Sequence, residues 1–171
     1  DTVLSRGLGD VYKRQLAFHA VNSDFPIFDD IQKFVVDRGK AAGAGDQIGT
    51  VLYNRGMYNA MLITEAARTA QAIAGKSNIS QADMIKGFEA LEMTEEKMAA
   101  LGLPGFGPSF SVSCENHGGD GMVAVAQWDA GAGKWSIVSD FQASDMSVIQ
   151  PLIDADSGAF ASENNLSPNC N

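Results

Sequence analysis

The sequence predicts an α/β protein. Apolar residues at helical spacing alternate along the chain with short apolar segments that have the composition of strands. Glycine- and proline-rich stretches separate these segments, and there is no internal repeat. A chain of 171 residues with 45% hydrophobic content can form one domain core, or half of a two-lobed protein.

The first half of the chain is expected to begin with a strand over residues 16–21. A helix follows over residues 26–39, because cap-forming residues and a proline precede apolar residues at i, i+4, i+7 and i+8. A second strand is expected at residues 48–52, ending in a polar-aromatic turn at residues 53–56. The turn opens into a helix that ends near Ala74 and is apolar on nearly every side, which predicts that this helix is buried.

The second half is expected to begin with two capped helices. Ser80 and Asp83 have the spacing of a capping box, and Thr94 caps a shorter helix that stops at Gly102. The remaining expected elements are an irregular segment at 103–108, alternating strand residues from Phe110 to Cys114, a hairpin of 122–128 with 135–140, and a final helix over 145–156.

The first residues are expected not to belong to the natural protein. Residues 5–15, SRGLGDVYKRQ, resemble a translated sequencing adapter, so we interpret residues 1–15 as an adapter-derived artefact. Leu16 is then the first natural residue, and the gene product is expected to be truncated upstream, where a signal peptide would lie.

Charge and hydropathy exclude several classes of partner. The net charge is −9 and the pI is near 4.5, whereas nucleic-acid binding depends on clustered lysine and arginine. The same charge argues against adhesion to anionic lipid. No apolar run approaches the roughly 18–20 residues that span a bilayer. We therefore expect no nucleic-acid partner and no membrane span in this chain.

The sequence offers little for cofactor, metal or covalent chemistry. The glycine-rich stretches at 43–49 and 129–134 do not match nucleotide-binding motifs. Cys114 and His117 have metal-like spacing, but a structural zinc site needs four ligands. No nucleophile stands beside a recognisable base and acid. We expect no cofactor, no metal and no enzymatic activity.

The two cysteines leave two interpretations open. In an exported protein Cys114 and Cys170 would pair and tie down the C-terminal tail, whereas in a cytosolic protein they would be unrelated thiols. The candidate binding site is the turn at residues 53–56, because turns at the carboxyl ends of strands often hold small molecules in α/β proteins.

Several motifs resemble one protein family. They are Gly49–Gly56, the helix Tyr58–Gln71, Phe106–Pro108, Cys114–Gly119 and Gln127–Asp129. In order and spacing they resemble the C-terminal part of periplasmic substrate-binding proteins of ABC transporters, in the branched-chain amino acid (leucine-binding-protein-like) class. The resemblance covers residues 16–171 and about the last two-fifths of a full family member.

The resemblance implies a partial type I periplasmic-binding-protein fold with two Rossmann-like lobes and three crossing segments. Residues 22–121 would form the second half of the N-terminal lobe, and residues 16–21 and 122–171 would belong to the C-terminal lobe. The implied function is to bind an amino acid, amide or small carboxylate between the lobes and deliver it to the permease subunits of an ABC importer. The alternative is a ligand-sensing domain of a receptor or regulator with the same fold.

The resemblance also implies roles for individual residues. An aromatic residue at the position of Tyr53 lines the ligand cleft, Asn54 and Arg55 share its turn, and His19 lies just before the first crossing. It implies a disulfide between Cys114 and Cys170 and a periplasmic location. Because the upstream strands would be missing, we also expect apolar surface to be exposed.

Overall fold

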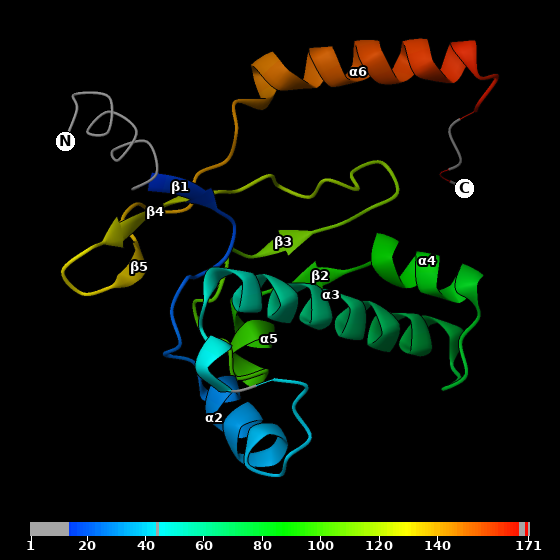
Figure 1. Cartoon of the computed structure of the whole chain (residues 1–171). Coiled ribbons are helices and arrows are strands. Elements are labelled where there is room, and N and C mark those ends of the chain that lie inside the picture. Colours follow the sequence, from blue (N-terminus) through cyan, green and yellow to red (C-terminus); the bar gives the residue numbers. More distant parts are fainter. Residues whose placement is uncertain (1–13, 44, 168–169, 171) are drawn as a thin grey trace, which may run out of the picture.

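A computed structural model describes residues 14–43, 45–167 and 170 (Figure 1). These residues form a mixed α/β structure with two small sheets. The elements are β1 (Arg14–Ala17), α2 (Pro26–Ile31), a π-helix η1 (Gln32–Val36), a 3-10 turn η2 (Gly45–Gln47), α3 (Val51–Ala74), α4 (Gln81–Glu89), β2 (Glu92–Met93), α5 (Glu95–Ala100), β3 (Phe110–Ser111), β4 (Ala124–Asp129), β5 (Lys134–Ile137) and α6 (Met146–Glu163).

The larger sheet has the order β1-β4-β5 and is antiparallel, with Leu16 opposite Val125 and Trp128 opposite Trp135. β4 and β5 confirm the predicted hairpin, which a short turn connects. The second sheet pairs β2 with β3, again antiparallel. The parallel sheets of Rossmann-like lobes are therefore not seen among the described strands. The larger sheet joins residues from the segments 16–21 and 122–171, while their assignment to one lobe stays a prediction.

The first strand is displaced from its predicted range. β1 begins at Arg14 and ends at Ala17, because its partner strand β4 extends far enough for Arg14 to pair with Gln127. The segment from Phe18 to Val21 leaves the sheet and turns into the body. Of the stretch interpreted as an adapter, residues 1–13 lie outside the described residues.

The start of α3 corrects a prediction. Residues 48–52 do not form a strand and residues 53–56 do not form a turn, because the helix begins at Val51. Thr50 is extended (φ −68°, ψ 156°) and its hydroxyl oxygen accepts a hydrogen bond from the Tyr53 amide, which is the geometry of an N-cap. The helix runs for 24 residues and ends at Gly75 in the left-handed conformation.

The prediction that α3 is buried all round is also wrong. Among its residues only Asn54, Met61, Ala66 and Ala70 are buried. Leu52 and Ile63 on other faces are 80% and 55% exposed. The apolar surface that we expected to be exposed is therefore present in this structure.

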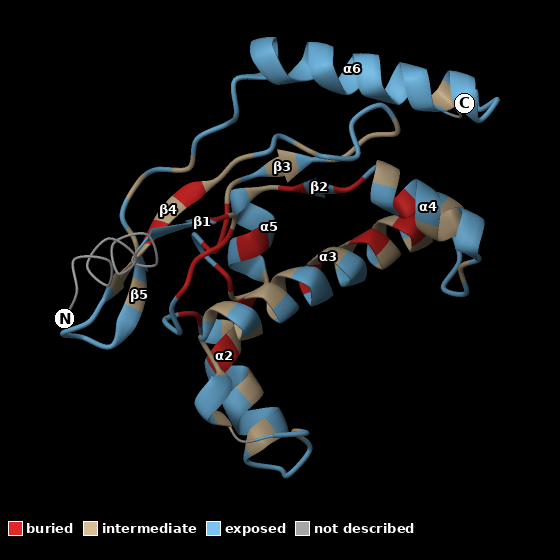
Figure 2. Cartoon of the chain, turned by 45° about the horizontal axis from the view of Figure 1, so that its top comes forward, coloured by how far each residue is buried: buried red, intermediate tan, exposed pale blue. Residues whose placement is uncertain are grey.

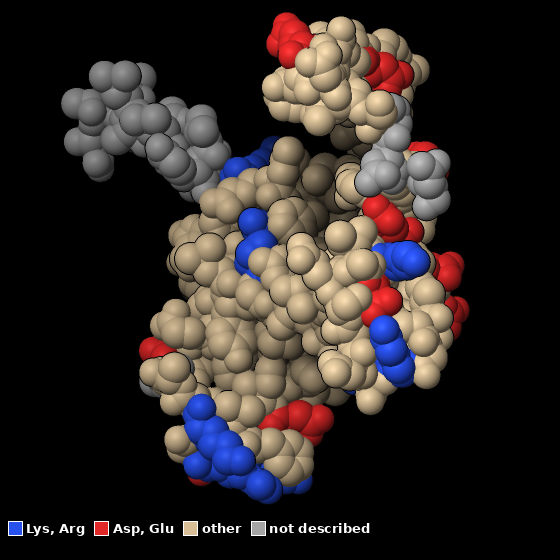
Figure 3. Space-filling model, turned by 90° about the vertical axis from the view of Figure 1, so that its right-hand side faces the viewer, with Lys and Arg blue, Asp and Glu red and all other residues tan. Residues whose placement is uncertain are grey.

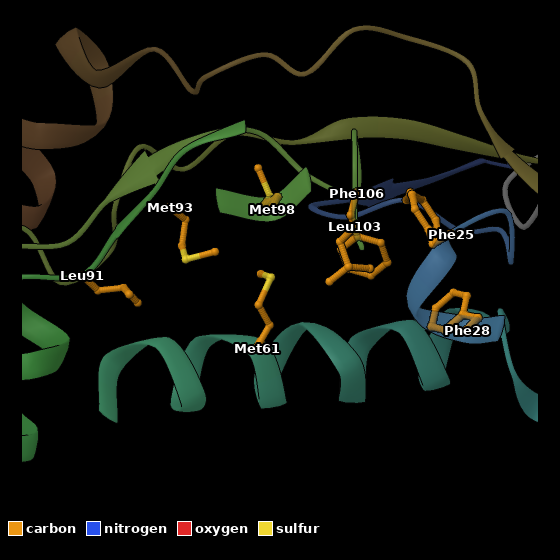
Figure 4. Packing of buried hydrophobic residues seen from close by; sticks show 9 residues of the cluster. Phe25, Phe28, Met61, Leu91, Met93, Met98, Leu103 and Phe106 are labelled. Atoms are coloured by element: carbon orange, nitrogen blue, oxygen red, sulfur yellow. The ribbon is translucent and has the colours of Figure 1, made fainter. Parts of the chain in front are cut away.

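The main core lies between α3 and the segments that cross above it (Figure 4). Phe106 is fully buried at its centre, and its ring lies 5.0 Å from that of Phe25 in an edge-on arrangement. The other buried members are Ala20, Phe28, Met61, Leu91, Met93, Met98 and Leu103. A smaller cluster combines Ala17 of β1 and Ala126 of β4, both in the larger sheet, with Val21.

The caps of α4 and α5 confirm the sequence predictions. Ser80 and Asp83 form a reciprocal capping box, and the Thr94 hydroxyl oxygen accepts from the Lys97 amide. α4 packs closely on α3 through Gly87, which lies against Ala66 and Ala70. The alternating residues from Phe110 form only a two-residue strand, because β2 offers only two partner residues.

The C-terminal helix stands apart from the rest of the chain. α6 ends at Glu163, later than predicted, and every one of its residues except Ala161 is exposed (Figure 2). Cys170 forms a disulfide with Cys114, which ties the tail to the segment after β3. In the described part of the chain, none of the helices combines the length and hydropathy needed to cross a membrane.

Candidate functional site

A hollow of about 590 Å³ opens at the start of α3. We call it the α3 hollow. Three segments form its walls: residues 21–24, residues 47–52, and the tip of the β4–β5 hairpin with Trp128 and residues 133–135. Segments that are distant in sequence thus meet at one helix N-terminus.

The floor of the α3 hollow is set by the helix cap. The Thr50 hydroxyl donates a hydrogen bond to the Gln47 carbonyl at 2.8 Å and accepts one from the Tyr53 amide at 3.4 Å. Gly49 has φ +83°, and a Cβ there would lie 2.4 Å from the Cβ of Ser23. Only glycine therefore lets the two segments approach this closely. The N-terminus of a helix carries partial positive charge, so this floor favours anionic groups.

The opposite wall is aromatic. Trp128 and Trp135 are direct partners across the hairpin, with ring centroids 5.7 Å apart and planes inclined by 58°. They are the two tryptophans of the chain, and both line the α3 hollow. Lys134 lies beside them on the same wall and is exposed.

A second hollow of about 460 Å³ adjoins the first. The two share Asn22, Asp24, Lys134 and Trp135 among their lining residues. The Asn22 amide donates to the Asp24 carboxylate at 3.2 Å. An acidic and a basic side chain therefore line both hollows.

Three of the four predicted site residues come together behind these hollows. Asn54 donates from its side-chain amide to the Ala20 carbonyl at 3.0 Å and to the Asn22 carbonyl at 2.9 Å. His19 is fully buried, and its Nδ1 lies 2.8 Å from the Ala20 carbonyl oxygen. Arg55 donates from Nε to His19 Nε2 at 3.3 Å. This cluster fixes the segment that leads from β1 into the wall of the α3 hollow.

The surroundings of His19 set its protonation. Arg55 can only donate, so Nε2 is the acceptor, and Nδ1 carries the proton that it donates to Ala20. Burial lowers the pKa of His19; the hydrogen bond to the Ala20 carbonyl raises it, and the charge of Arg55 lowers it further. The Arg55 guanidinium also lies over the Phe18 ring, 4.1 Å from its centroid.

Tyr53 is placed differently from the other three. Its ring packs edge-on against Phe28 at 6.0 Å, at the border of the main core. It is not among the residues that line the α3 hollow. Tyr53 points elsewhere because residues 53–55 are helical, and successive side chains of a helix point in different directions. The sequence prediction had placed these three residues together in a loop turn.

Sequence reasoning missed the tryptophan pair. Trp128 and Trp135 stand at equivalent positions on either side of the predicted hairpin turn, so the register of the hairpin alone would have paired them. What the sequence does not show is that the hairpin tip meets the start of α3.

The residues with metal-like spacing do not form a ligand set. Glu89, Cys114 and His117 lie close together, but the Cys114 sulfur is in the disulfide with Cys170. His117 Nε2 lies 3.4 Å from the Glu89 carboxylate. This group therefore offers two ligand side chains, fewer than a structural zinc site needs.

Comparisons with known proteins give one informative match. No family model and no curated protein matches the chain. A solved structure described as an ABC transporter permease from the Pseudomonas fluorescens group is 32% identical, with a TM-score of 0.82 over 92% of this chain. The chain is related to an ABC transporter protein. It spans 38% of the length of that solved protein.

The same match overturns the family assignment made from the sequence motifs. The matching protein is described as a permease, not as a periplasmic substrate-binding protein. The relation to an ABC transporter protein rests on this structural match, and not on the short motifs behind the assignment.

Proposed function

We propose that this chain binds a small polar solute in the α3 hollow, as part of an ABC transporter-related protein. One observation carries the proposal: a hollow of about 590 Å³ has a helix N-terminus on one side and both tryptophans on the other. Sites for small molecules are typically concave, of roughly 300–1,000 Å³, with apolar walls and a few polar groups.

The chemistry of the walls favours an amino acid, an amide or a small carboxylate. The first turn of α3 offers backbone N–H groups and partial positive charge to a carboxylate. Lys134 adds a positive charge on the facing wall, and Asp24 supplies a negative charge suited to an ammonium group. The tryptophan faces would cover the apolar part of such a solute.

The proposed action is binding without covalent chemistry, with delivery to a membrane component of the same transporter. The Cys114–Cys170 disulfide supports a location in an oxidising compartment such as the periplasm.

Calorimetric titration with a panel of amino acids, amides and small carboxylates tests the proposal. We expect at least one solute to bind. Lys134→Gln should raise the dissociation constant of a carboxylate ligand about fivefold, because one such contact contributes about 1 kcal/mol. Lys86→Gln is the matched control, because Lys86 lies on α4 and does not line the α3 hollow. Failure of every solute to bind, or equal effects of the two substitutions, would contradict the proposal.

A further inference from the structure

A second concave surface lies away from the α3 hollow. Two hollows of about 350 and 360 Å³ adjoin each other and share Leu62, Phe110, Val112 and His117. The second is also lined by Ile85, Phe88 and Leu91. Ile85 is 51% exposed, so this surface is apolar and open to solvent. We call the two hollows together the α4 groove.

One half of α6 is an apolar face without a partner in the described structure. Val148, Ile149, Leu152, Ile153 and Phe160 recur at helical spacing, and all of them are exposed. Figure 3 shows α6 standing off the body of the molecule. An apolar stripe on a helix is normally buried against another element.

Both ends of α6 are anchored at the rim of the α4 groove. Before the helix, Gln142 exchanges two backbone hydrogen bonds with Val123, at 2.9 and 2.8 Å, and Val123 lines the groove. After the helix, Cys170 is bonded to Cys114, which lies close in sequence to Val112 and His117.

The connections are long enough for α6 to move without breaking either anchor. Gln142 precedes the N-cap Asp145 by three residues, and Cys170 follows Glu163 by seven. Extended, these connections reach about 10 Å and about 24 Å. The helix itself is about 27 Å long, at about 1.5 Å per residue.

We propose that α6 is a strap that closes onto the α4 groove with its apolar face inward. The strap is the occupant favoured over a separate partner, because two tethers hold it at an effective concentration of the order of millimolar. In the closed state Leu152 and Ile153 cover Ile85 and Phe88, and Ser147 and Asp154 stay in solvent. Closure also covers Phe18 and Tyr58 in the floor of the groove. It therefore encloses the Phe18 ring, over which the Arg55 guanidinium lies.

Hydrogen exchange of the α6 backbone amides, measured on the whole chain, tests the strap. We expect the amides of α6 to exchange at least about tenfold more slowly than the same amides in an unfolded chain. Leu152→Asp on the strap and Ile85→Asp in the groove should each abolish this protection. Both side chains are exposed in the open structure, so neither substitution disturbs the core. Gly158→Asp is the matched control and should keep the protection, because Gly158 lies on the opposite side of α6 and an added Cβ there meets nothing within 4 Å.

Three results would overturn the strap. The first is an α6 whose amides exchange freely in the unsubstituted chain. The second is loss of protection with Leu152→Asp but not with Ile85→Asp, because α6 would then pack somewhere else. The third is protection that appears only together with a dimeric mass in light scattering, which would place α6 on a second copy. Cys170→Ser releases one anchor and should reduce the protection several-fold if the tether acts as proposed.

Discussion

The packing of α4 on α3 depends on the missing side chain of Gly87. A Cβ at this position would lie 2.2 Å from the carbonyl oxygen of Ala66 and 2.9 Å from the backbone nitrogen of Ala70. Backbone atoms of a helix cannot move aside like the end of a flexible side chain, so Gly87→Ala must push the two helices apart. Overpacking costs about 1–3 kcal/mol, and an approach of 2.2 Å to a backbone atom places Gly87→Ala at the upper end, about 3 kcal/mol. The better helix propensity of alanine returns about 1 kcal/mol, so we expect a net loss of about 2 kcal/mol.

Gly56 supplies the matched control. It lies inside α3, and a Cβ there would meet nothing within 4 Å. Gly56→Ala should therefore stabilise the chain by about 0.5–1 kcal/mol through helix propensity alone. The assay is urea unfolding followed by far-ultraviolet circular dichroism, with the free energy of unfolding compared at equal slope. If Gly87→Ala is neutral or stabilising, the close α3–α4 contact is absent and the reasoning fails.

Two further predictions concern the buried cluster behind the α3 hollow. Asn54→Ala removes hydrogen bonds to two backbone carbonyls and should lower the free energy of unfolding by about 1–2 kcal/mol. The control is Asn59→Ala on the exposed face of α3, which should change the free energy of unfolding by less than about 0.5 kcal/mol. The pKa of His19 in the folded chain lies below its usual value of 6.5, so the unfolded chain takes up the proton first as the pH falls. The free energy of unfolding should therefore decrease as the pH drops below about 6.5, and it should level off below the folded pKa. His19→Gln should flatten this dependence in denaturation curves between pH 8 and pH 5. An unchanged slope in the His19 variant would contradict the assignment.

Local signals in the sequence predicted several elements correctly. The Ser80 capping box, the Thr94 cap and the β4–β5 hairpin each depend on residues within a few positions of one another. The start of α3 was predicted wrongly because the local sequence there is ambiguous. Val51 and Leu52 suit a strand as well as a helix, and the decision falls to Thr50, whose hydroxyl caps the helix.

The site depends on contacts between distant segments, which local patterns do not encode. His19 and Arg55 are 36 positions apart, yet they share a hydrogen bond in the interior. The disulfide closes a separation of 56 positions. Tyr53 was the expected ligand residue, but the helical phase turns it toward Phe28, and the tryptophan pair faces the hollow from another segment.

The most direct test of the proposed function uses the two tryptophans as reporters. Trp128 and Trp135 both line the α3 hollow, and no other tryptophan contributes to the emission. We expect a bound amino acid, amide or small carboxylate to change the tryptophan emission saturably, with the same dissociation constant as calorimetry. We expect the change to shrink in Trp128→Phe and in Trp135→Phe. A solute that binds by calorimetry but leaves the emission of both tryptophans unchanged would show that it binds outside the α3 hollow.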